Sequence, residues 1–293
     1  MDLARGPVCV KRALARLRVA QKWEAPVERN RYEHRWMEKA ARAVAGAAPA
    51  ILAADDAAGL FAMEYLEPRE HPVWKEQLRR GHADPDFASR VGAALAAIHA
   101  STTGPENARM FPTDEIFYAI RLEPYLVATA AKHPDVAPSL LSLVERTART
   151  KLALVHGDVS PKNILAGPNG PVFLDAECAW FGDPAFDLAF CLNHLLLKCV
   201  WVPQASTRFL ACFDALAGAY LSGVAWESAD ALEARAASLL PGLLLARIDG
   251  KSPVEYLTQD AEKNQVRGFA RGFLLQPTPS LLALRKAWQK SLM

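Results

Sequence analysis

The spacing of apolar residues predicts a small mixed α/β unit at the start of the chain. Residues 7–11 (PVCVK), 51–54 and 60–66 are short runs with high β propensity. Residues 29–45 carry apolar side chains at intervals of three and four, which is the spacing of an amphipathic helix with one buried face. We therefore expect a strand, a helix and two further strands within residues 1–67, which would form a first, nucleotide-binding domain.

Helical periodicity dominates the remainder, residues 68–293, which we expect to form a second and larger domain. Its helices are predicted at residues 87–100, 114–132, 139–149 and 184–198. A polar loop is expected at residues 101–112, and a strand at residues 153–155 precedes a hairpin of residues 164–166 and 172–174. Positions rich in proline or glycine predict breaks in the last helical part, at Pro203, Gly223, Pro241–Gly242, Gly250–Pro253 and Pro277–Pro279. The pattern as a whole is that of an α+β protein.

The composition is that of an ordinary soluble globular enzyme. Of the 293 residues, 51% are apolar and 23% charged, and the net charge of +2 gives no reason to expect nucleic acid or a membrane as partner. The five cysteines include no C-x-x-C pair, which argues against a zinc site or a disulfide framework. The first residues lack the apolar core of a signal peptide, and no uncharged apolar run is long enough to span a membrane. We therefore expect a cytoplasmic protein.

Polar residues gather between the predicted strand at 153–155 and the end of the hairpin. Asp158 and Asn163 lie five residues apart in one loop, and Asp175 follows the second hairpin strand. Phosphoryl transfer needs a group that orients or deprotonates the attacking hydroxyl, and oxygen ligands that hold Mg²⁺ on the phosphates. We predict that Asp158 serves the hydroxyl and that the side chains of Asn163 and Asp175 are metal ligands.

His156 lies in the same loop, next to Gly157, and could be either a base or a structural residue. We favour the structural role, because an imidazole ring beside a glycine can hydrogen-bond to backbone groups and hold the loop in place.

Two segments resemble motifs of a known family. HGDVSPKN at residues 156–163 resembles the H-G-D-x-x-x-x-N catalytic loop of the aminoglycoside phosphotransferases and their relatives, which include choline kinases and methylthioribose kinases. GDPAFDLA at residues 182–189 resembles the G-D-P-x-x-D-L-A segment of the same family. The resemblance implies a two-lobed protein-kinase-like fold, with a small mixed α/β N-lobe, apparently truncated here, and a large, mainly helical C-lobe.

The resemblance extends to the N-terminal part of the chain. PVCVK resembles the strand whose lysine touches the nucleotide phosphates, which nominates Lys11 rather than its neighbour Arg12. Glu33 stands where the family's helix offers a carboxylate to that lysine, although Glu28 and Glu38 are competitors for this role.

Further residues receive roles only from this resemblance. LFAMEYLE at residues 60–67 resembles the last N-lobe strand and the hinge, so the backbone around Glu64 and Leu66 would meet the adenine ring. Asp187, inside the second motif, would support the catalytic loop through contacts with its backbone. The implied cofactors are ATP and Mg²⁺.

Two features depart from the family pattern. Ten residues precede Lys11, too few for the hairpin and loop that normally cover the phosphates. The chain would then start downstream of the natural start or make fewer nucleotide contacts. The usual D-F-G or D-x-D metal segment is Asp175-Ala176-Glu177, similar to the D-P-E of methylthioribose kinases. Glu177 is then an additional metal ligand, a substrate contact or a solvent-facing carboxylate.

The acceptor site is expected in the helical C-terminal part. Arg247, Asp249 and Lys251 surround Gly250 at a predicted helix break, where polar groups can face a cleft; a capped helix end with solvated charges is the alternative. Residues 178–293 carry 10 acidic and 11 basic side chains, without the acidic excess expected of a site for polycationic aminoglycosides. This balance favours a neutral or sugar-like alcohol.

These observations predict an ATP-dependent phosphotransferase that moves the γ-phosphoryl group to a hydroxyl of a small molecule, either a sugar-like or an amino-alcohol acceptor. A nucleotide-binding pseudokinase with little or no activity is the alternative. A protein kinase is less well supported, because no A-P-E segment or long activation loop follows Asp175.

Overall fold

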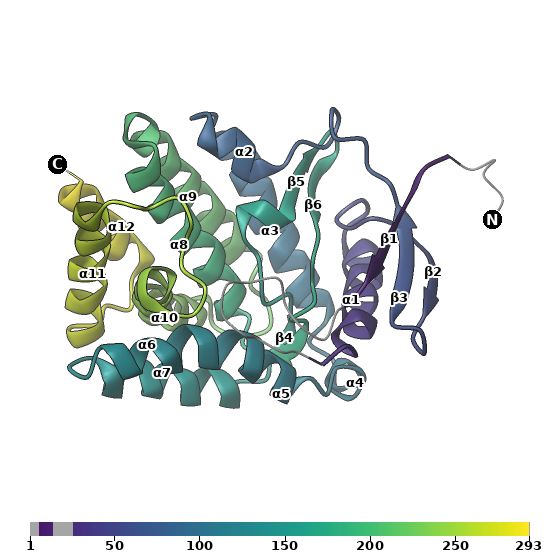
Figure 1. Cartoon of the computed structure of the whole chain (residues 1–293), viewed down its shortest axis with the longest axis horizontal. Helices are drawn as coiled ribbons and strands as arrows, with labels where there is room; N and C mark the ends of the chain where they lie inside the picture. Colours follow the sequence, from purple (N-terminus) through teal and green to yellow (C-terminus); the bar gives the residue numbers. More distant parts are fainter. Residues whose placement is uncertain (1–5, 14–25, 293) are drawn as a thin grey trace.

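The structure, a computed structural model, describes residues 6–13 and 26–292. A small sheet-containing part at the N-terminal end adjoins a large, mainly helical part, which confirms the predicted α+β class (Figure 1). Within the described ranges, no helix is both long and apolar enough to cross a membrane.

The N-terminal part is an antiparallel sheet of three strands in the order β1-β3-β2. β1 (Val8–Arg12) pairs with β3 (Leu60–Glu64), and β3 pairs with β2 (Ile51–Asp55) through a tight turn. The turn includes Gly59, whose φ of +63° lies in the left-handed region that glycine adopts readily. The register places Lys11 opposite Phe61, so the lysine strand depends on β3 for its position.

Helix α1 (Arg29–Ala43) lies between this sheet and the rest of the molecule (Figure 1). Its apolar stripe includes Trp36, Met37 and Ala40, all fully buried, as the sequence periodicity predicts. The Trp36 ring meets the ring of His156 edge-on, with 4.6 Å between the ring centroids. The core of the N-terminal part is therefore continuous with the catalytic loop.

Short strands frame the loop that carries the candidate chemistry. β4 (Ala153–Val155) pairs with β7 (Trp180–Gly182), and β5 (Ile164–Gly167) forms a hairpin with β6 (Gly170–Phe173). The one-turn 3₁₀ helix η3 (Pro161–Asn163) joins the loop to β5.

Helices make up most of the remaining chain. They are α2 (Trp74–Arg79), α3 (Pro85–Ser101), α4 (Pro105–Met110), α5 (Asp114–Phe117), the π-helix η2 (Tyr118–Val127), α6 (Ala128–Lys132), α7 (Ala137–Arg149), α8 (Ala185–Trp201), the 3₁₀ helix η4 (Pro203–Ala205), α9 (Ser206–Ser222), α10 (Ala229–Asp249), α11 (Asp260–Leu275) and α12 (Leu281–Ser291). α5, η2 and α6 follow one another without a gap, so the helix predicted at 114–132 exists but contains a stretch with wider π-type turns.

Helix α8 is the centre of the helical part. Every residue from Ala185 to Val200 is buried, and the helix packs against α9 and α10 (Figure 1). A helix that is apolar on all sides is stable only where neighbours cover it completely. Its first turn, which carries Asp187, is therefore held rigidly beneath the catalytic loop.

Two secondary-structure expectations were wrong. The polar loop expected at 101–112 contains α4, and α10 runs through Pro241 and Gly242 without the predicted break. The short elements α2 and β7 were not predicted: α2 spans fewer than two helical turns, and β7 is defined by its pairing with β4, which only the folded chain shows.

Candidate active site

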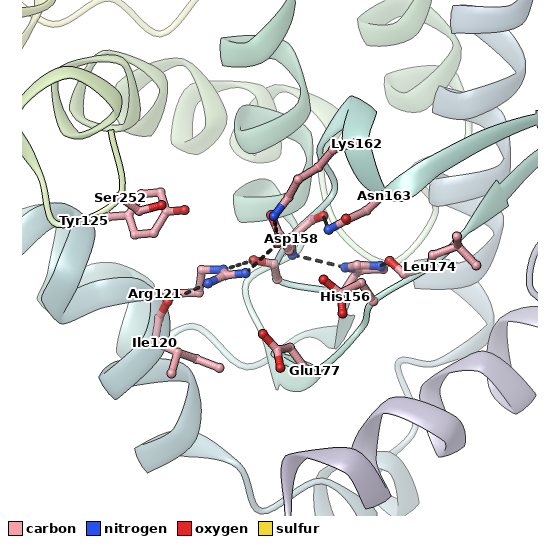
Figure 2. A network of polar contacts seen from close by, with 12 residues as sticks. Ile120, Arg121, Tyr125, His156, Asp158, Lys162, Asn163, Leu174, Glu177 and Ser252 are labelled. Atoms are coloured by element: carbon pink, nitrogen blue, oxygen red, sulfur yellow. Dashed lines mark hydrogen bonds and ion pairs between the residues drawn. The ribbon is translucent and has the colours of Figure 1, made fainter. Parts of the chain in front are cut away.

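The turn after β4 requires glycine at position 157. Gly157 has a φ of +79°, and a Cβ at this position would lie 2.7 Å from the Cβ of Cys178. Any other residue would be strained in its backbone and would also collide with the segment that leads into β7. The glycine thereby turns the chain so that Asp158 faces the site (Figure 2).

Asp187 holds the backbone of this turn. Its two carboxylate oxygens accept hydrogen bonds from the amide groups of His156 at 2.7 Å and Gly157 at 2.8 Å. The ring of His99 contacts the same carboxylate at 3.2 Å through Nε2 and the hydroxyl of Tyr220 at 2.7 Å through Nδ1. These contacts are the ones that the predicted supporting role of Asp187 requires.

His156 is fully occupied by local hydrogen bonds. Its Nε2 donates to the carbonyl of Leu174 at 3.0 Å, and its Nδ1 accepts from the amide of Asp158 at 3.1 Å. Burial lowers the pKa of the ring below its ordinary value, which favours the neutral form that these two bonds need. The imidazole links the catalytic loop to the end of the hairpin and leaves no nitrogen free to act as a base.

Asp158 is a buried carboxylate between two cations. Its Oδ2 lies 2.9 Å from Nη2 of Arg121 and 3.3 Å from Nζ of Lys162 (Figure 2). Although burial raises the pKa of Asp158, attraction to Lys162 and Arg121 lowers it below its ordinary value. The side chain is therefore ionised at neutral pH and able to accept a hydrogen bond from an incoming hydroxyl.

The sequence interpretation missed Arg121, which lies in the π-helix η2. The guanidinium donates from Nε to the carbonyl of Gly157 and from Nη1 to that of Ile120 at 2.6 Å, and it lies near the rings of Tyr125 and Phe190. It thus fixes both the backbone and the side chain of the catalytic loop. A single arginine on the buried face of the predicted helix at 114–132 was the signal that could have revealed it.

Asn163 and Asp175 are neighbours across the β5–β6 hairpin. The amide of Leu174 donates to the carbonyl of Asn163 at 2.8 Å, and Nδ2 of Asn163 donates to the carbonyl of Asp158 at 3.1 Å. The side-chain oxygen of Asn163 is the atom that remains to accept or ligate. Asp175 follows with a φ of +65°, a conformation that aspartate tolerates better than most residues and that is found at functional sites.

Lys11 reaches this centre from β1. Its Nζ lies 2.6 Å from Oε1 of Glu33 and also contacts Oδ1 of Asp175. Although burial lowers the pKa of Lys11, Glu33 and Asp175 raise it above its ordinary value, so the ammonium stays charged. Burial raises the pKa of Glu33 to about 7, and the charge of Lys11 opposes this shift. The carboxylate that pairs with Lys11 on α1 is therefore Glu33 and not Glu28 or Glu38, and the basic partner of Glu33 is Lys11 and not Arg12.

Glu177 contacts an arginine. Its Oε2 lies 2.7 Å from Nε of Arg29, the first residue of α1. Nη1 of Arg29 also donates a hydrogen bond to the carbonyl of Pro26 at 2.9 Å. The side chain of Arg29 is almost completely buried and that of Glu177 largely so. Glu177 thereby joins the end of the metal segment to the N-terminal part, a contact that the sequence did not suggest.

Glu64 and Leu66 line a cavity of about 160 Å³ between β3 and the β5–β6 hairpin. Its other walls include Ala48, Val172 and the hairpin turn at Gly167 and Gly170. The lining combines apolar side chains such as Leu66 and Val172 with polar ones such as His71 and Asn169, a mixture that suits a flat heterocycle such as adenine.

The three substrate candidates separate in the structure. Arg247 is buried and lines a cavity beside Lys162. Asp249 instead pairs with Arg267 and His133, and Lys251 pairs with Glu123 at the surface, 2.6 Å from its Oε1. Helix α10 ends at Asp249, so the predicted break is present. The ion pairs of Asp249 and Lys251 hold this helix end against α11 and η2, and of the three only Arg247 lines the cavity beside the candidate site.

The small sheet-containing part, the large helical part and the loop between them are arranged as in the kinase-like fold. The solved structure of amicoumacin kinase hAmiN shares the fold with a TM-score of 0.55 at 14% sequence identity, over 89% of this chain and 81% of that one. The sequence model of the phosphotransferase enzyme family matches residues 11–232, and the chain belongs to this family. The family resemblance found in the sequence is thus confirmed.

Curated relatives are methylthioribose kinases. The chain is 26% identical to that of Pectobacterium atrosepticum over 228 residues, which are 67% of this chain and 55% of the relative. It is 25% identical to that of Cronobacter sakazakii over 226 residues, with the same coverage of 67% and 55%. The chain spans about half the length of the curated relatives it matches.

Proposed function

We propose that the protein transfers the γ-phosphoryl group of ATP to a hydroxyl of a small molecule. The observation that carries this proposal is the ionised, buried carboxylate of Asp158, in the same loop as Asn163. The adjoining β5–β6 hairpin leads to Asp175, which contacts Lys11, and Lys11 pairs with Glu33. A phosphotransferase needs a group that accepts the hydrogen bond of the substrate hydroxyl, ligands for a metal ion and a cation that contacts the phosphates. These residues can supply all three.

In this mechanism Asp158 accepts the hydrogen bond of the acceptor hydroxyl and aligns its oxygen with the γ-phosphorus. Because Arg121 and Lys162 keep the carboxylate ionised, it is a weak base, and proton transfer follows the formation of the new P–O bond rather than preceding it. Lys162 also places a positive charge beside the transferred group. Orientation and electrostatic stabilisation therefore provide most of the catalytic effect.

The residues present fit a magnesium ion. Nδ2 of Asn163 is used by the Asp158 carbonyl, so its oxygen is available, and Asp175 adds a carboxylate from the adjoining hairpin. Mg²⁺ is usually bound by one or two such oxygen ligands together with substrate phosphates. Asn163 and Asp175 would hold the ion, which neutralises charge on the phosphates, and Glu177 remains a further predicted ligand.

The nucleotide would bind between the N-terminal part and the hairpin. Adenine would occupy the cavity at Glu64 and Leu66, and Lys11, which contacts Asp175, would meet the phosphates. The phosphates would replace Asp175 as a partner of Lys11, while Glu33 keeps the ammonium in place. This assigns residues 1–67 to nucleotide binding and residues 68–293 to catalysis and acceptor binding.

The methylthioribose kinases among the relatives make a sugar-like alcohol the first acceptor to examine. We also place the reaction in the cytoplasm, a proposal supported by the unpaired state of all five cysteines. The relatives described above are kinases, and nothing in the site favours the alternative of a non-catalytic pseudokinase.

Replacement of Asp158 tests this function. In Asp158→Ala, we expect acceptor-dependent ATP consumption to fall by about a thousandfold or more, because the hydroxyl loses its orienting group. Mg·ATP binding, measured by calorimetry, should persist. The control is Asp230→Ala, which removes an exposed carboxylate in the first turn of α10. Full activity of Asp158→Ala would disprove the assignment, and Mg·ATP binding by the unmodified protein without turnover of any acceptor would favour the pseudokinase.

A further inference from the structure

A cavity of about 30 Å³ adjoins the catalytic loop and is surrounded by positive charge. We call it the basic pocket; its lining is Lys75, Ser160, Pro161, Lys162, His194, Lys198, Arg247, Glu255 and Tyr256. Four of these side chains are lysine or arginine. Glu255 is the one acid among the described lining residues, and it pairs with Lys75. The pocket therefore carries a net positive charge beside the site of transfer.

The basic pocket lies on the acceptor side of Asp158. Ser160 and Lys162 belong to the catalytic loop itself, and Lys162 contacts Asp158 directly. The guanidinium of Arg247 contacts the hydroxyls of Tyr125 at 3.2 Å and Ser252 at 3.0 Å. Figure 2 shows these two residues on the opposite side of Asp158 from Leu174, which precedes the metal segment. A group bound in the pocket would thus approach Asp158 from the side away from the nucleotide.

Lys198 forms the floor of the basic pocket, where a buried cation is costly. Its side chain is 1% exposed, and its Nζ lies 3.7 Å from the centroid of the Tyr256 ring and 4.3 Å from that of Trp201. Burial, together with repulsion from Lys75, lowers the pKa of Lys198 to about 6. The two rings favour the ammonium form, but no carboxylate among the described residues forms an ion pair with Lys198. An anion bound in the pocket would stabilise the ammonium form.

Four further polar atoms around the pocket lack partners. Among the described residues, no hydrogen bond reaches the buried Nε2 of His194, Oγ of Ser160, Nε of Arg247 or the hydroxyl of Tyr256. A buried polar atom without a hydrogen-bond partner is destabilising, and such atoms rarely gather around one cavity unless something binds there. His194 and Ser160 are more than nine-tenths buried, so the cavity itself is the place where they can find a partner.

We propose that the acceptor carries an anionic group, a carboxylate or a phosphate, which the basic pocket binds while the acceptor hydroxyl contacts Asp158. The proposal rests on the proposed function and names the substrate class. A volume of about 30 Å³ is that of a charged substituent rather than of a whole sugar. The positive charge of the pocket would repel the amino group of an amino alcohol, so the pocket disfavours the amino-alcohol acceptor that the sequence also allowed.

Matched sets of acceptors test the proposal. ATP consumption is measured with glycerol, glycerate and glycerol 3-phosphate, with ribose, ribonate and ribose 5-phosphate, and with methylthioribose and ethanolamine. We expect the acidic members of a set to have a kcat/KM about tenfold to a hundredfold above the neutral member, because charge-assisted hydrogen bonds are stronger than neutral ones. The carboxylates and phosphates within each set identify the anionic group.

Two variants assign the effect to the pocket. Lys198→Met and Lys75→Met each remove one charge and keep an unbranched side chain, and they should reduce kcat/KM for the acidic acceptor about tenfold or more. KM for ATP should not change. Lys290→Met, at an exposed lysine of α12 far from the site, is the control. In parallel, isothermal titration with inorganic phosphate and with glycerate measures anion binding, which should weaken in the two pocket variants and not in Lys290→Met.

The outcomes separate this proposal from the proposed function. Neutral or cationic acceptors used as well as or better than acidic ones would overturn the anionic-acceptor proposal and leave the phosphotransferase intact. Pocket variants that act like Lys290→Met would do the same. If no acceptor is consumed, the titrations decide: anion binding lost in Lys198→Met supports the pocket, and no pocket-dependent binding overturns it. Absence of Mg·ATP binding would instead count against the phosphotransferase.

Discussion

The charge and the orientation of the Asp158 side chain depend on the residues that touch it. Asp158 lies against Arg121 and Lys162, and its amide donates to His156. The two cations keep it ionised, and the histidine fixes the direction in which it leaves the turn. A buried carboxylate without such partners would take up a proton and lose its ability to accept the hydroxyl hydrogen bond.

Asp187 supports the loop through three hydrogen bonds, so its removal should cost stability. In Asp187→Ala, the amides of His156 and Gly157 and the ring of His99 lose their common acceptor. We expect the free energy of unfolding to fall by about 3–5 kcal/mol, since each buried unsatisfied donor costs about 1–3 kcal/mol. Urea denaturation measures this. Asp230→Ala, also in the first turn of a helix, should change it by no more than about 0.5 kcal/mol; an equally small change in Asp187→Ala would contradict the supporting role.

Glu33 should make nucleotide use depend on pH near neutrality. Burial raises its pKa to about 7, so Glu33 gains a proton as the pH falls through 7 and loses part of its hold on Lys11. We expect kcat/KM for ATP to decrease on the acid side of pH 7. The same shift makes ionisation of Glu33 reduce stability as the pH rises from about 4.5 to 7, because the native state then binds more protons than the unfolded one.

Glu33→Gln provides the test of that dependence. The variant is neutral at every pH, so its kcat/KM for ATP should be about tenfold lower at pH 8 and should lack the inflection near pH 7. Glu38→Gln changes an exposed carboxylate of the same helix and should retain the inflection. An inflection that persists in Glu33→Gln would show that another group is responsible.

At the scale of elements, the sequence predicted those whose pattern is long and locally consistent. The strand at β1, helix α1 and the β5–β6 hairpin lie within one or two residues of their expected bounds. The break expected at Pro241–Gly242 is absent because helix propensity is a local property of the sequence, whereas the stability of the helix also depends on its packing against distant residues. Proline costs a helix about 3 kcal/mol, and the packing of the buried stretch 239–248 of α10 outweighs that cost.

The residues of the candidate site likewise divide into those that the sequence predicted and those that it did not. Asp158, Asn163 and Asp175 were nominated because they are close in sequence. Arg121 was overlooked, although its place on the buried face of the predicted helix at 114–132 was a usable signal. Lys198 and the basic pocket could not be found, since the lining comes from α2, the loop around η3, α8, α10 and the segment after α10, which only the folded chain brings together.

Gly242 illustrates how packing decides what a residue costs in a helix. A Cβ at Gly242 would lie 3.0–3.4 Å from the side chains of Leu143, Leu126 and Leu140, so α10 approaches η2 and α7 closely here. We expect Gly242→Val to lower the free energy of unfolding by about 1–3 kcal/mol through overpacking. Gly268→Val, in α11, meets nothing within 4 Å and should be neutral or stabilising by up to about 0.5 kcal/mol. Similar effects at both positions would contradict the close approach.

At the scale of the whole molecule, two ion pairs connect the N-terminal part to the segment after β6. Lys11 contacts Asp175, and Arg29 contacts Glu177. The two acids are separated by one residue, so the strand and the helix of the N-terminal part are both tied to the predicted metal segment. Relative movement of the two parts would therefore alter the position of Asp175.

The Arg29–Glu177 pair allows the open role of Glu177 to be decided. If it mainly connects the two parts, Arg29→Met and Glu177→Gln should each reduce the free energy of unfolding by about 1–3 kcal/mol, and the double variant should lose no more than either alone. The double-mutant cycle would then give a coupling of about 1–3 kcal/mol, and the Mg²⁺ concentration for half-maximal activity would change equally in both single variants.

If Glu177 is a metal ligand, Glu177→Gln alone should raise that concentration about tenfold, with little coupling to Arg29. The structure favours the first result, because one oxygen of Glu177 is engaged by an arginine whose side chain is almost completely buried.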